Sequence, residues 1–121
     1  MNRLKICIEQ RRALEPAALT CIAIGVQTPG VIISRWQRET WALPWSYLLS
    51  ARCAGPGDSA QLVLSFTTQV VTADGQNLAS VLEAVAGFRL SLLRELPAAS
   101  RPQLPAGAPF VSRIEIRAAE Q

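Results

Sequence analysis

The sequence predicts an α+β fold, in which a twisted antiparallel sheet or a partly closed small barrel carries one packed helix. Three observations support this prediction. Apolar and polar residues alternate along several short segments, and clusters of Gly and Pro separate these segments. The spacing changes to that of an amphipathic helix over residues 76–87, and alternation returns in a late strand over residues 110–117. A chain of 121 residues, half of them apolar, can bury about two-thirds of its surface without a disulfide or a metal.

The N-terminal segment, residues 1–28, has two open interpretations. Residues 3–8 alternate as a half-buried strand does, and residues 19–26 form a nearly continuous apolar run typical of a buried strand. The sequence Thr-Pro-Gly at 28–30 then predicts a turn. The segment is therefore either a pair of integral strands or a loosely ordered basic extension that precedes a single α+β domain over residues 29–121.

The middle of the chain is predicted to be an antiparallel sheet. Residues 31–36, 39–43 and 45–53 read as three strands joined by short connections. The cluster of Gly, Pro, Asp and Ser over residues 54–59 predicts a hairpin turn into the next strand, residues 62–66.

One helix is predicted after a further extended stretch that ends at Asp74 and Gly75. Its apolar stripe follows the spacing i, i+3, i+4, i+7 and consists of Leu78, Val81, Leu82 and Val85. Asp74 or Asn77 is expected to cap the free N–H groups at its start. Gly87 is expected to end the helix in a left-handed conformation.

The C-terminal third is predicted to return to the sheet. Residues 88–93 alternate and favour a strand, with a helix that continues to Leu96 as the alternative. Residues 97–109 contain four prolines and read as a surface connection. Residues 110–117 alternate again and are expected to pair with the sheet. A pleckstrin-homology-like or other small barrel would satisfy this order of elements, an analogy of fold that implies no function.

The absence of histidine restricts the chemistry. Ser-His-Asp and Cys-His catalysis, imidazole metal sites and a histidine-based pH switch all require a residue that this chain lacks. No pair of carboxylates is spaced in a way that indicates acid–base work. We therefore expect a protein that is not an enzyme, with no catalytic, cofactor-binding or metal-binding residues.

The three cysteines indicate a reducing compartment. Cys7, Cys21 and Cys53 match no zinc-ligand spacing, and an odd number fits a disulfide framework poorly. Glu15 and Pro16 interrupt the start of the apolar stretch over residues 17–26, which argues against a secretory signal. The stretch is also too short to span a bilayer. We expect a cytoplasmic protein of bacterial type. Cys53 lies between Arg52 and the glycine-rich loop, an electropositive setting that makes it the candidate reactive thiol.

The net charge of +3 is unevenly distributed. Residues 1–28 hold four basic and two acidic residues, whereas residues 29–121 hold eight basic and seven acidic residues. The body of the chain is therefore nearly neutral, and it lacks the dense basic pattern of a nucleic-acid-binding module.

Aromatic and arginine residues are concentrated in one predicted hairpin. The candidate interaction surface consists of Arg35, Trp36, Arg38, Trp41 and Trp45. These residue types dominate binding hot spots and also stack on bases. Alternatively, Trp41, Trp45 and Tyr47 belong to the core and the arginines lie over their edges. In both cases Trp36 is the tryptophan that we expect to be exposed.

The resulting hypothesis is a small binding or accessory domain that acts through a protein contact or through homo-oligomerisation. The expected partner is a protein or a second copy of the chain, without a cofactor and without a membrane. Weak nucleic-acid binding is the less favoured alternative, and a small-ligand carrier or an enzyme without a recognisable motif is the third.

Overall fold

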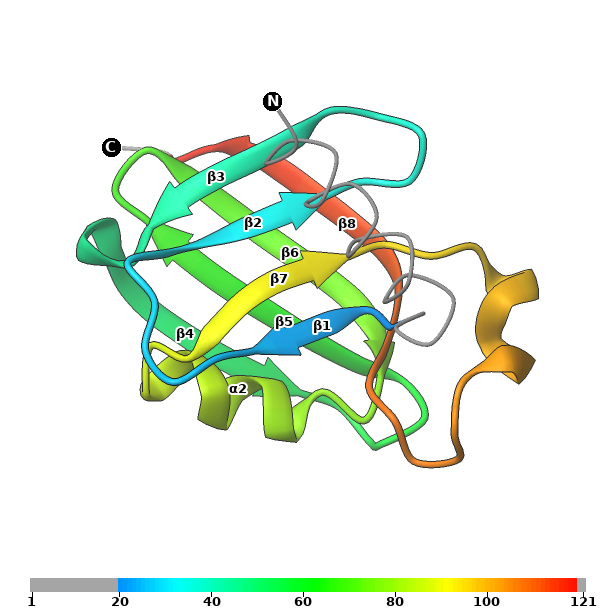
Figure 1. The fold of residues 1–121 in the computed structure, drawn as a ribbon. Helices are drawn as coiled ribbons and strands as arrows, with labels where there is room; N and C mark the ends of the chain where they lie inside the picture. The colour runs from blue at the N-terminus through cyan, green and yellow to red at the C-terminus, as the bar shows by residue number, and fades with distance from the viewer. Residues whose placement is uncertain (1–19, 120–121) are drawn as a thin grey trace, which may run out of the picture.

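The structure is a computed structural model that describes residues 20–119. Eight strands in this part of the chain form two four-stranded sheets, and one α-helix accompanies them (Figure 1). In spatial order, the first sheet, sheet A, consists of β1 (Ile22–Ile24), β7 (Leu90–Arg94), β2 (Gly30–Ser34) and β3 (Thr40–Pro44). The second, sheet B, consists of β4 (Leu48–Ala54), β5 (Ala60–Phe66), β6 (Gln69–Gln76) and β8 (Phe110–Ala118). The α+β class is confirmed. The described residues form no closed barrel, and the pleckstrin-homology-like analogy is not confirmed.

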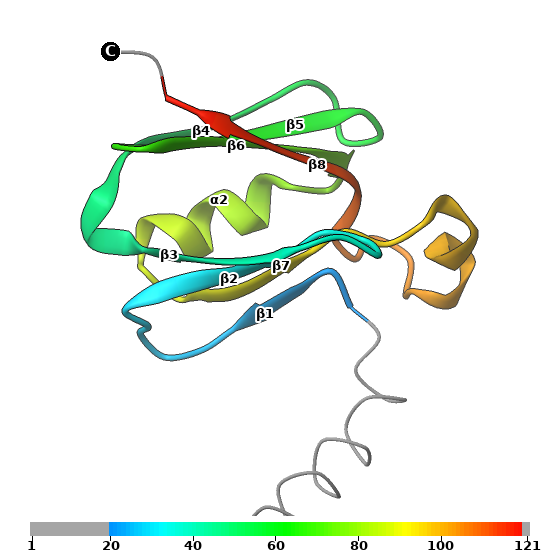
Figure 2. The same ribbon diagram turned by 90° about the horizontal axis from the view of Figure 1, so that it is seen from above.

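The core lies between the two sheets. Figure 2 shows the sheets as two layers, with the helix α2 (Ala79–Ala86) lying between them. The helix turns Val81, Ala84 and Val85 into the core, so the stripe predicted from the sequence is the face that it buries. This burial accounts for an eight-residue helix, because a helix of that length is not stable alone in water.

Sheet B is an antiparallel meander completed by the last strand. Leu62, Leu64 and Phe66 of β5 are buried and their neighbours face outward, which confirms the predicted alternation. The hairpin between β4 and β5 turns over residues 55–59, as expected. β8 pairs with β6 and occupies the opposite edge of the sheet from β4.

Sheet A combines strands from two distant parts of the chain, residues 22–44 and 90–94. β2 pairs antiparallel with β3 and parallel with β7, and β1 pairs antiparallel with β7 at the edge. The parallel pair requires a long crossover, which here passes through all of β4, β5, β6 and α2. β1 is therefore part of the sheet, whereas the strand expected over residues 3–8 lies outside the described residues. A division of the chain at residue 29 stays a prediction.

Two predicted features near Trp45 are wrong. The strand expected from Trp45 begins only at Leu48, because residues 45–47 form a 3-10 turn, η1, that carries the chain from sheet A to sheet B. The pairing of β4 with β5 then shifts register between Leu48 and Ser50. This irregularity changes which side chains face inward. Leu49 is 70% exposed, and Tyr47, which one alternative placed in the core, is 54% exposed.

The helix boundaries also differ in detail from the prediction. β6 continues to Gln76 and does not stop at Asp74, and the residue before α2 is Leu78, which offers no side-chain cap. Asn77 has a positive φ of 58° and donates from Nδ2 to the carbonyl of Ala108. At the other end Gly87 keeps a negative φ, and Phe88 takes the left-handed conformation with φ of 54°.

The region after the helix agrees with the favoured interpretation. Residues 90–94 form strand β7, so the continuation of the helix to Leu96 is wrong. The proline-rich connection holds only a short 3-10 segment, η2 (Ala98–Gln103), which projects from the body of the molecule (Figure 2). The late strand predicted over residues 110–117 is β8.

The buried strand expected over residues 19–26 is reduced to β1, and the Val26 side chain lies outside the core.

The close approach of β6 to β8 requires glycine at position 75. The ladder shifts register between Asp74 and Gly75, and an added Cβ at Gly75 would lie 1.8 Å from the carbonyl oxygen of Phe110. Glycine inside a strand commonly marks such an irregularity.

We predict that Gly75→Ala lowers the free energy of unfolding by at least about 2 kcal/mol, because the two strands must separate to admit the methyl group. Gly57→Ala is the matched control, since its nearest atom, Asn77 Oδ1, is 3.6 Å away and its φ is not positive. We expect the control to stay within about 0.5 kcal/mol of the parent. Urea unfolding followed by circular dichroism measures both, and equal losses would contradict the assigned contact.

Candidate functional site

The three tryptophans of the sequence-predicted surface have different environments. Trp45 is only 4% exposed and stacks on Phe66 with a centroid distance of 5.9 Å. Its indole Nε1 donates to Thr28 Oγ1 at 3.2 Å. Trp45 therefore belongs to the core at the turn between the sheets, and its place in the candidate interaction surface was wrong.

Trp41 is held at the side of the hairpin by polar contacts. Its indole Nε1 donates to Glu39 Oε2 at 3.1 Å, and Arg35 Nη1 donates to the same oxygen at 2.9 Å. The hydrogen bond from Trp41, the backbone N–H of Glu39 and the charge of Arg35 hold the pKa of the Glu39 carboxyl below its usual value. Trp41 is half-buried against the core, so it contributes only its edge to the surface.

Trp36 is exposed, at 45%, on a turn with a defined conformation. The Arg38 N–H donates to the Arg35 carbonyl at 3.2 Å and closes a four-residue turn. Gln37, the third residue of that turn, has a φ of 55°, as a type II turn requires. The Trp36 N–H donates to Glu95 Oε1 at 2.8 Å, which ties the turn to the end of β7.

Glu95 also reaches the other sheet. Its Oε2 accepts the backbone N–H of Ile114, on β8, at 3.1 Å. One carboxylate therefore links the β2–β3 turn of sheet A to the edge strand of sheet B. Charge-assisted hydrogen bonds of this kind are among the stronger ones in proteins.

These contacts surround a hollow of about 390 Å³ between the β2–β3 turn and β8. We call it the Arg–Trp hollow. Its lining residues are Arg35, Trp36, Arg38, Glu95, Arg113, Ile114 and Glu115. Three of the five residues predicted from the sequence thus lie together, and β8 supplies a third arginine that the sequence analysis did not single out.

Acidic and basic side chains are equal in number at the Arg–Trp hollow, but some of its guanidinium N–H groups lack a hydrogen-bond acceptor within residues 20–119. Its three arginines face Glu95 and Glu115 in the lining and Glu39 beside it. Every one of these carboxylates accepts a hydrogen bond from the fold. In contrast, the Arg38 guanidinium has no partner within residues 20–119, and the buried Arg35 Nε has none either.

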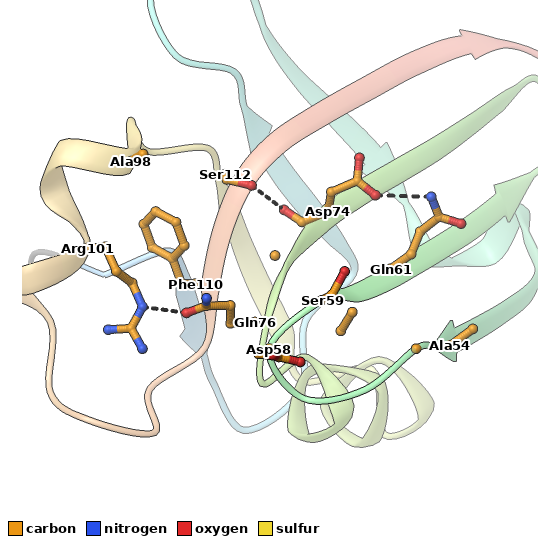
Figure 3. Close-up of a pocket in the computed structure, with 13 residues that line it drawn as sticks. Ala54, Asp58, Ser59, Gln61, Asp74, Gln76, Ala98, Arg101, Phe110 and Ser112 are labelled. Atoms are coloured by element: carbon orange, nitrogen blue, oxygen red, sulfur yellow. Dashed lines mark hydrogen bonds between the residues drawn. The ribbon is translucent and has the colours of Figure 1, made fainter.

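A second and larger hollow, about 710 Å³, lies where the β4–β5 turn meets β6, β8 and η2 (Figure 3). Five of its polar side chains take part in hydrogen bonds within the lining. Gln61 Nε2 donates to Asp74 Oδ1 at 3.0 Å, and Arg101 Nε donates to Gln76 Oε1 beside the Phe110 ring. Ser112 Oγ donates to the backbone carbonyl of Asp74 at 3.1 Å. These bonds link β5, η2 and β8 to β6 and engage part of the polar lining.

The two described cysteines are in different positions. Cys21 is completely buried, and its Sγ accepts the N–H of Val111 at 3.1 Å. Burial raises the pKa of the Cys21 thiol, although the hydrogen bond with Val111 and the charge of Arg94 act in the opposite direction. Cys53, the candidate reactive thiol, is half-buried on β4 and packs against the core. Cys7 lies outside the described residues.

Within residues 20–119, no three Cys, Asp or Glu side chains lie close enough together to hold a metal ion. No helix in the same part of the chain has the length and apolar character needed to cross a membrane. Comparisons with models of protein families, with curated proteins and with solved structures return no match to this chain. The functional argument therefore depends on the contacts of this chain alone.

Sequence reasoning missed Glu95 and Arg113. Glu95 is the last charged residue before the proline-rich connection, and Arg113 occupies an outward position in the alternating pattern of β8. Neither position differs in sequence from an ordinary solvated charge. Their relation to Trp36 arises only because β7 and β8 end and begin beside the β2–β3 turn.

We predict that Glu95→Ala lowers the free energy of unfolding by about 2 kcal/mol, because it leaves the N–H groups of Trp36 and Ile114 without acceptors. Glu95→Gln retains one acceptor oxygen and should lose about half as much. Glu83→Ala, on the exposed side of α2, is the control and should change stability little. Chemical unfolding measures the losses, and an equal effect of the Glu95 and Glu83 variants would contradict the link between the sheets.

The thiols yield a separate prediction. In a Cys7→Ser variant at pH 7.5, iodoacetamide should modify Cys53 before Cys21, because the Cys21 thiol is inaccessible and its raised pKa lowers the thiolate fraction. Peptide mapping by mass spectrometry identifies the modified residue over time, and a urea-unfolded sample should show similar rates at both. Faster modification of Cys21 in the folded protein would contradict its burial.

Proposed function

We propose that this domain is a non-catalytic binding module that contacts a protein partner through the Arg–Trp hollow. One observation carries the proposal: Trp36 is a large aromatic side chain that stays exposed while its backbone is held by Glu95. An aromatic residue on an ordered backbone loses little conformational entropy on binding. Trp and Arg are also the residues most enriched among binding hot spots.

The balance of charge supports a protein partner over a nucleic acid. Nucleic-acid surfaces carry a dense excess of basic residues, whereas Glu39, Glu95 and Glu115 accompany the three arginines here. Only one tryptophan is available for stacking, because Trp45 is in the core and Trp41 is half-buried. The paired polar groups of the hollow in Figure 3 also give less support to a small-ligand carrier.

The location proposed for this module is the cytoplasm, as the unpaired cysteines suggest. Cys21 and Cys53 are both free thiols in the structure. A buried free thiol such as Cys21 is typical of proteins from reducing compartments.

Photo-crosslinking in the native host tests the proposal. A benzophenone amino acid at Gln37, beside Trp36, should yield a crosslinked protein, which mass spectrometry identifies as a partner or as a second copy of this chain. The same probe at Gln61 is the matched comparison, since it lies exposed on sheet B in the hollow of Figure 3. We expect no product from position 61. Trp36→Ala should weaken binding of the purified partner by about 2 kcal/mol, or roughly 30-fold.

Three outcomes would overturn the proposal. The first is a product from position 61 alone, which would assign binding to the other hollow. The second is a product sensitive to nuclease and resistant to protease, with an affinity that falls steeply with salt, which would indicate a nucleic acid. The third is no product from either position in cells that express the domain at its native level.

A further inference from the structure

We propose that the Arg–Trp hollow recognises carboxylates, and that its partner presents an acidic segment in extended form. This inference deepens the function proposed above and rests on it. The occupant is identified by chemistry: the hollow offers guanidinium N–H donors that residues 20–119 do not use, next to an aromatic surface.

The inventory of donors supports this assignment. A guanidinium carries five N–H donors and no acceptor, and a planar carboxylate can accept two of them at once. Among the described residues, the guanidinium of Arg35 donates only through Nη1, to Glu39, and that of Arg113 only through Nη2, to Glu115. Arg38 donates through its backbone N–H and through no side-chain nitrogen. Most guanidinium donors at this hollow therefore have no acceptor within residues 20–119.

A second and independent observation comes from Arg35. Its side chain is only 13% exposed, and its Nε is buried without a hydrogen-bond partner. A buried N–H without an acceptor is costly, and such groups are rare in folded proteins. A carboxylate in the hollow would place further acceptor oxygens beside this guanidinium, which bonds only to Glu39 among the described residues.

The carboxylates of the hollow do not fill this role. Glu95 is engaged by the backbone N–H groups of Trp36 and Ile114, and Glu39 is shared by Arg35 and the Trp41 indole. The pair between Arg113 and Glu115 is exposed on both sides, at 66% and 55%. An exposed pair of this kind contributes little free energy, so an incoming carboxylate can compete for Arg113.

The glutamates beside the arginines limit the affinity of the Arg–Trp hollow for a carboxylate, and they limit how strongly salt changes that affinity. Three glutamates next to three arginines cancel the long-range field, so a single carboxylate binds through local hydrogen bonds and weakly. An acidic segment with several carboxylates gains affinity from successive contacts with Arg38 and Arg113. Its apolar side chains can pack on the exposed face of Trp36.

The probe for the test is glutarate, a dicarboxylate, titrated into ¹⁵N-labelled full-length protein at constant ionic strength. Inorganic phosphate is titrated in parallel. We expect glutarate to shift the Trp36 indole N–H and the Arg38 and Arg113 Nε–H resonances with a dissociation constant on the order of 1 mM. Phosphate should bind more weakly.

Three variants assign the site. Arg38→Gln and Arg113→Gln should each weaken glutarate binding about tenfold, which corresponds to the loss of a charge-assisted hydrogen bond. Arg52→Gln is the matched control, because Arg52 is an exposed arginine on β4, the opposite edge strand of sheet B from β8. The control should bind glutarate as the parent does. Unfolding curves confirm that all three variants are folded.

Several outcomes would overturn the inference. These are the absence of shifts with glutarate, tighter binding of phosphate than of glutarate, and an equal loss in Arg52→Gln. The crosslinking experiment separates this inference from the proposed function. A protein crosslinked at position 37 whose affinity is unchanged by Arg38→Gln and Arg113→Gln would retain the binding function and refute recognition of carboxylates. Glutarate binding without a crosslinked protein would support the chemistry and refute the protein partner.

Discussion

The two sheets of this domain are not joined by any strand pair in the described part of the chain, and this constraint governs the rest of the structure. The sheets are held together by the apolar core around α2 and by a few polar links. These links lie where β7 ends and β8 begins. Glu95 joins Trp36 to Ile114, the Leu96 N–H donates to the Val111 carbonyl, and the Val111 N–H donates to Cys21. Beside β8, the two sheets are therefore linked by two side chains, Glu95 and Cys21, and by one backbone hydrogen bond.

The candidate site follows from that junction. Because Glu95 is committed to two backbone N–H groups, it positions the turn that carries Trp36 and does not neutralise the arginines beside it. The same contact brings Arg113 of sheet B next to Arg35 and Arg38 of sheet A. A structural link between sheets thus creates a surface in which donors exceed the acceptors available to them. The hollow of Figure 3 is also a junction of segments, and there Gln61 bonds to Asp74 and Arg101 bonds to Gln76.

Much of the fold could be predicted because local patterns and tertiary burial agree in it. The alternation in β5 and β8 and the helical stripe of α2 correspond to faces that the core covers. The errors occur where a local irregularity changes the pattern. The 3-10 turn η1 leaves Tyr47 exposed, and the shift after Leu48 leaves Leu49 exposed. The tight end of α2 places the positive φ on Phe88 and not on the preceding glycine. Composition does not reveal such shifts, because a ladder can slip by one residue without a special residue type.

By itself, the sequence determined the class of fold, the strands and helix of the body, and the grouping of Trp and Arg residues in one hairpin. Periodicity and turn residues are local properties, so a single chain displays them directly. The sequence also favoured Trp36 as the exposed tryptophan. Only the tertiary structure decided that Trp45 is in the core and Trp41 is half-buried. It also decided that Glu95 and Arg113 belong to the same site as Trp36, although they lie 59 and 77 positions further along the chain. These relations depend on how two sheets pack, and packing brings together residues whose sequence positions carry no sign of their contact.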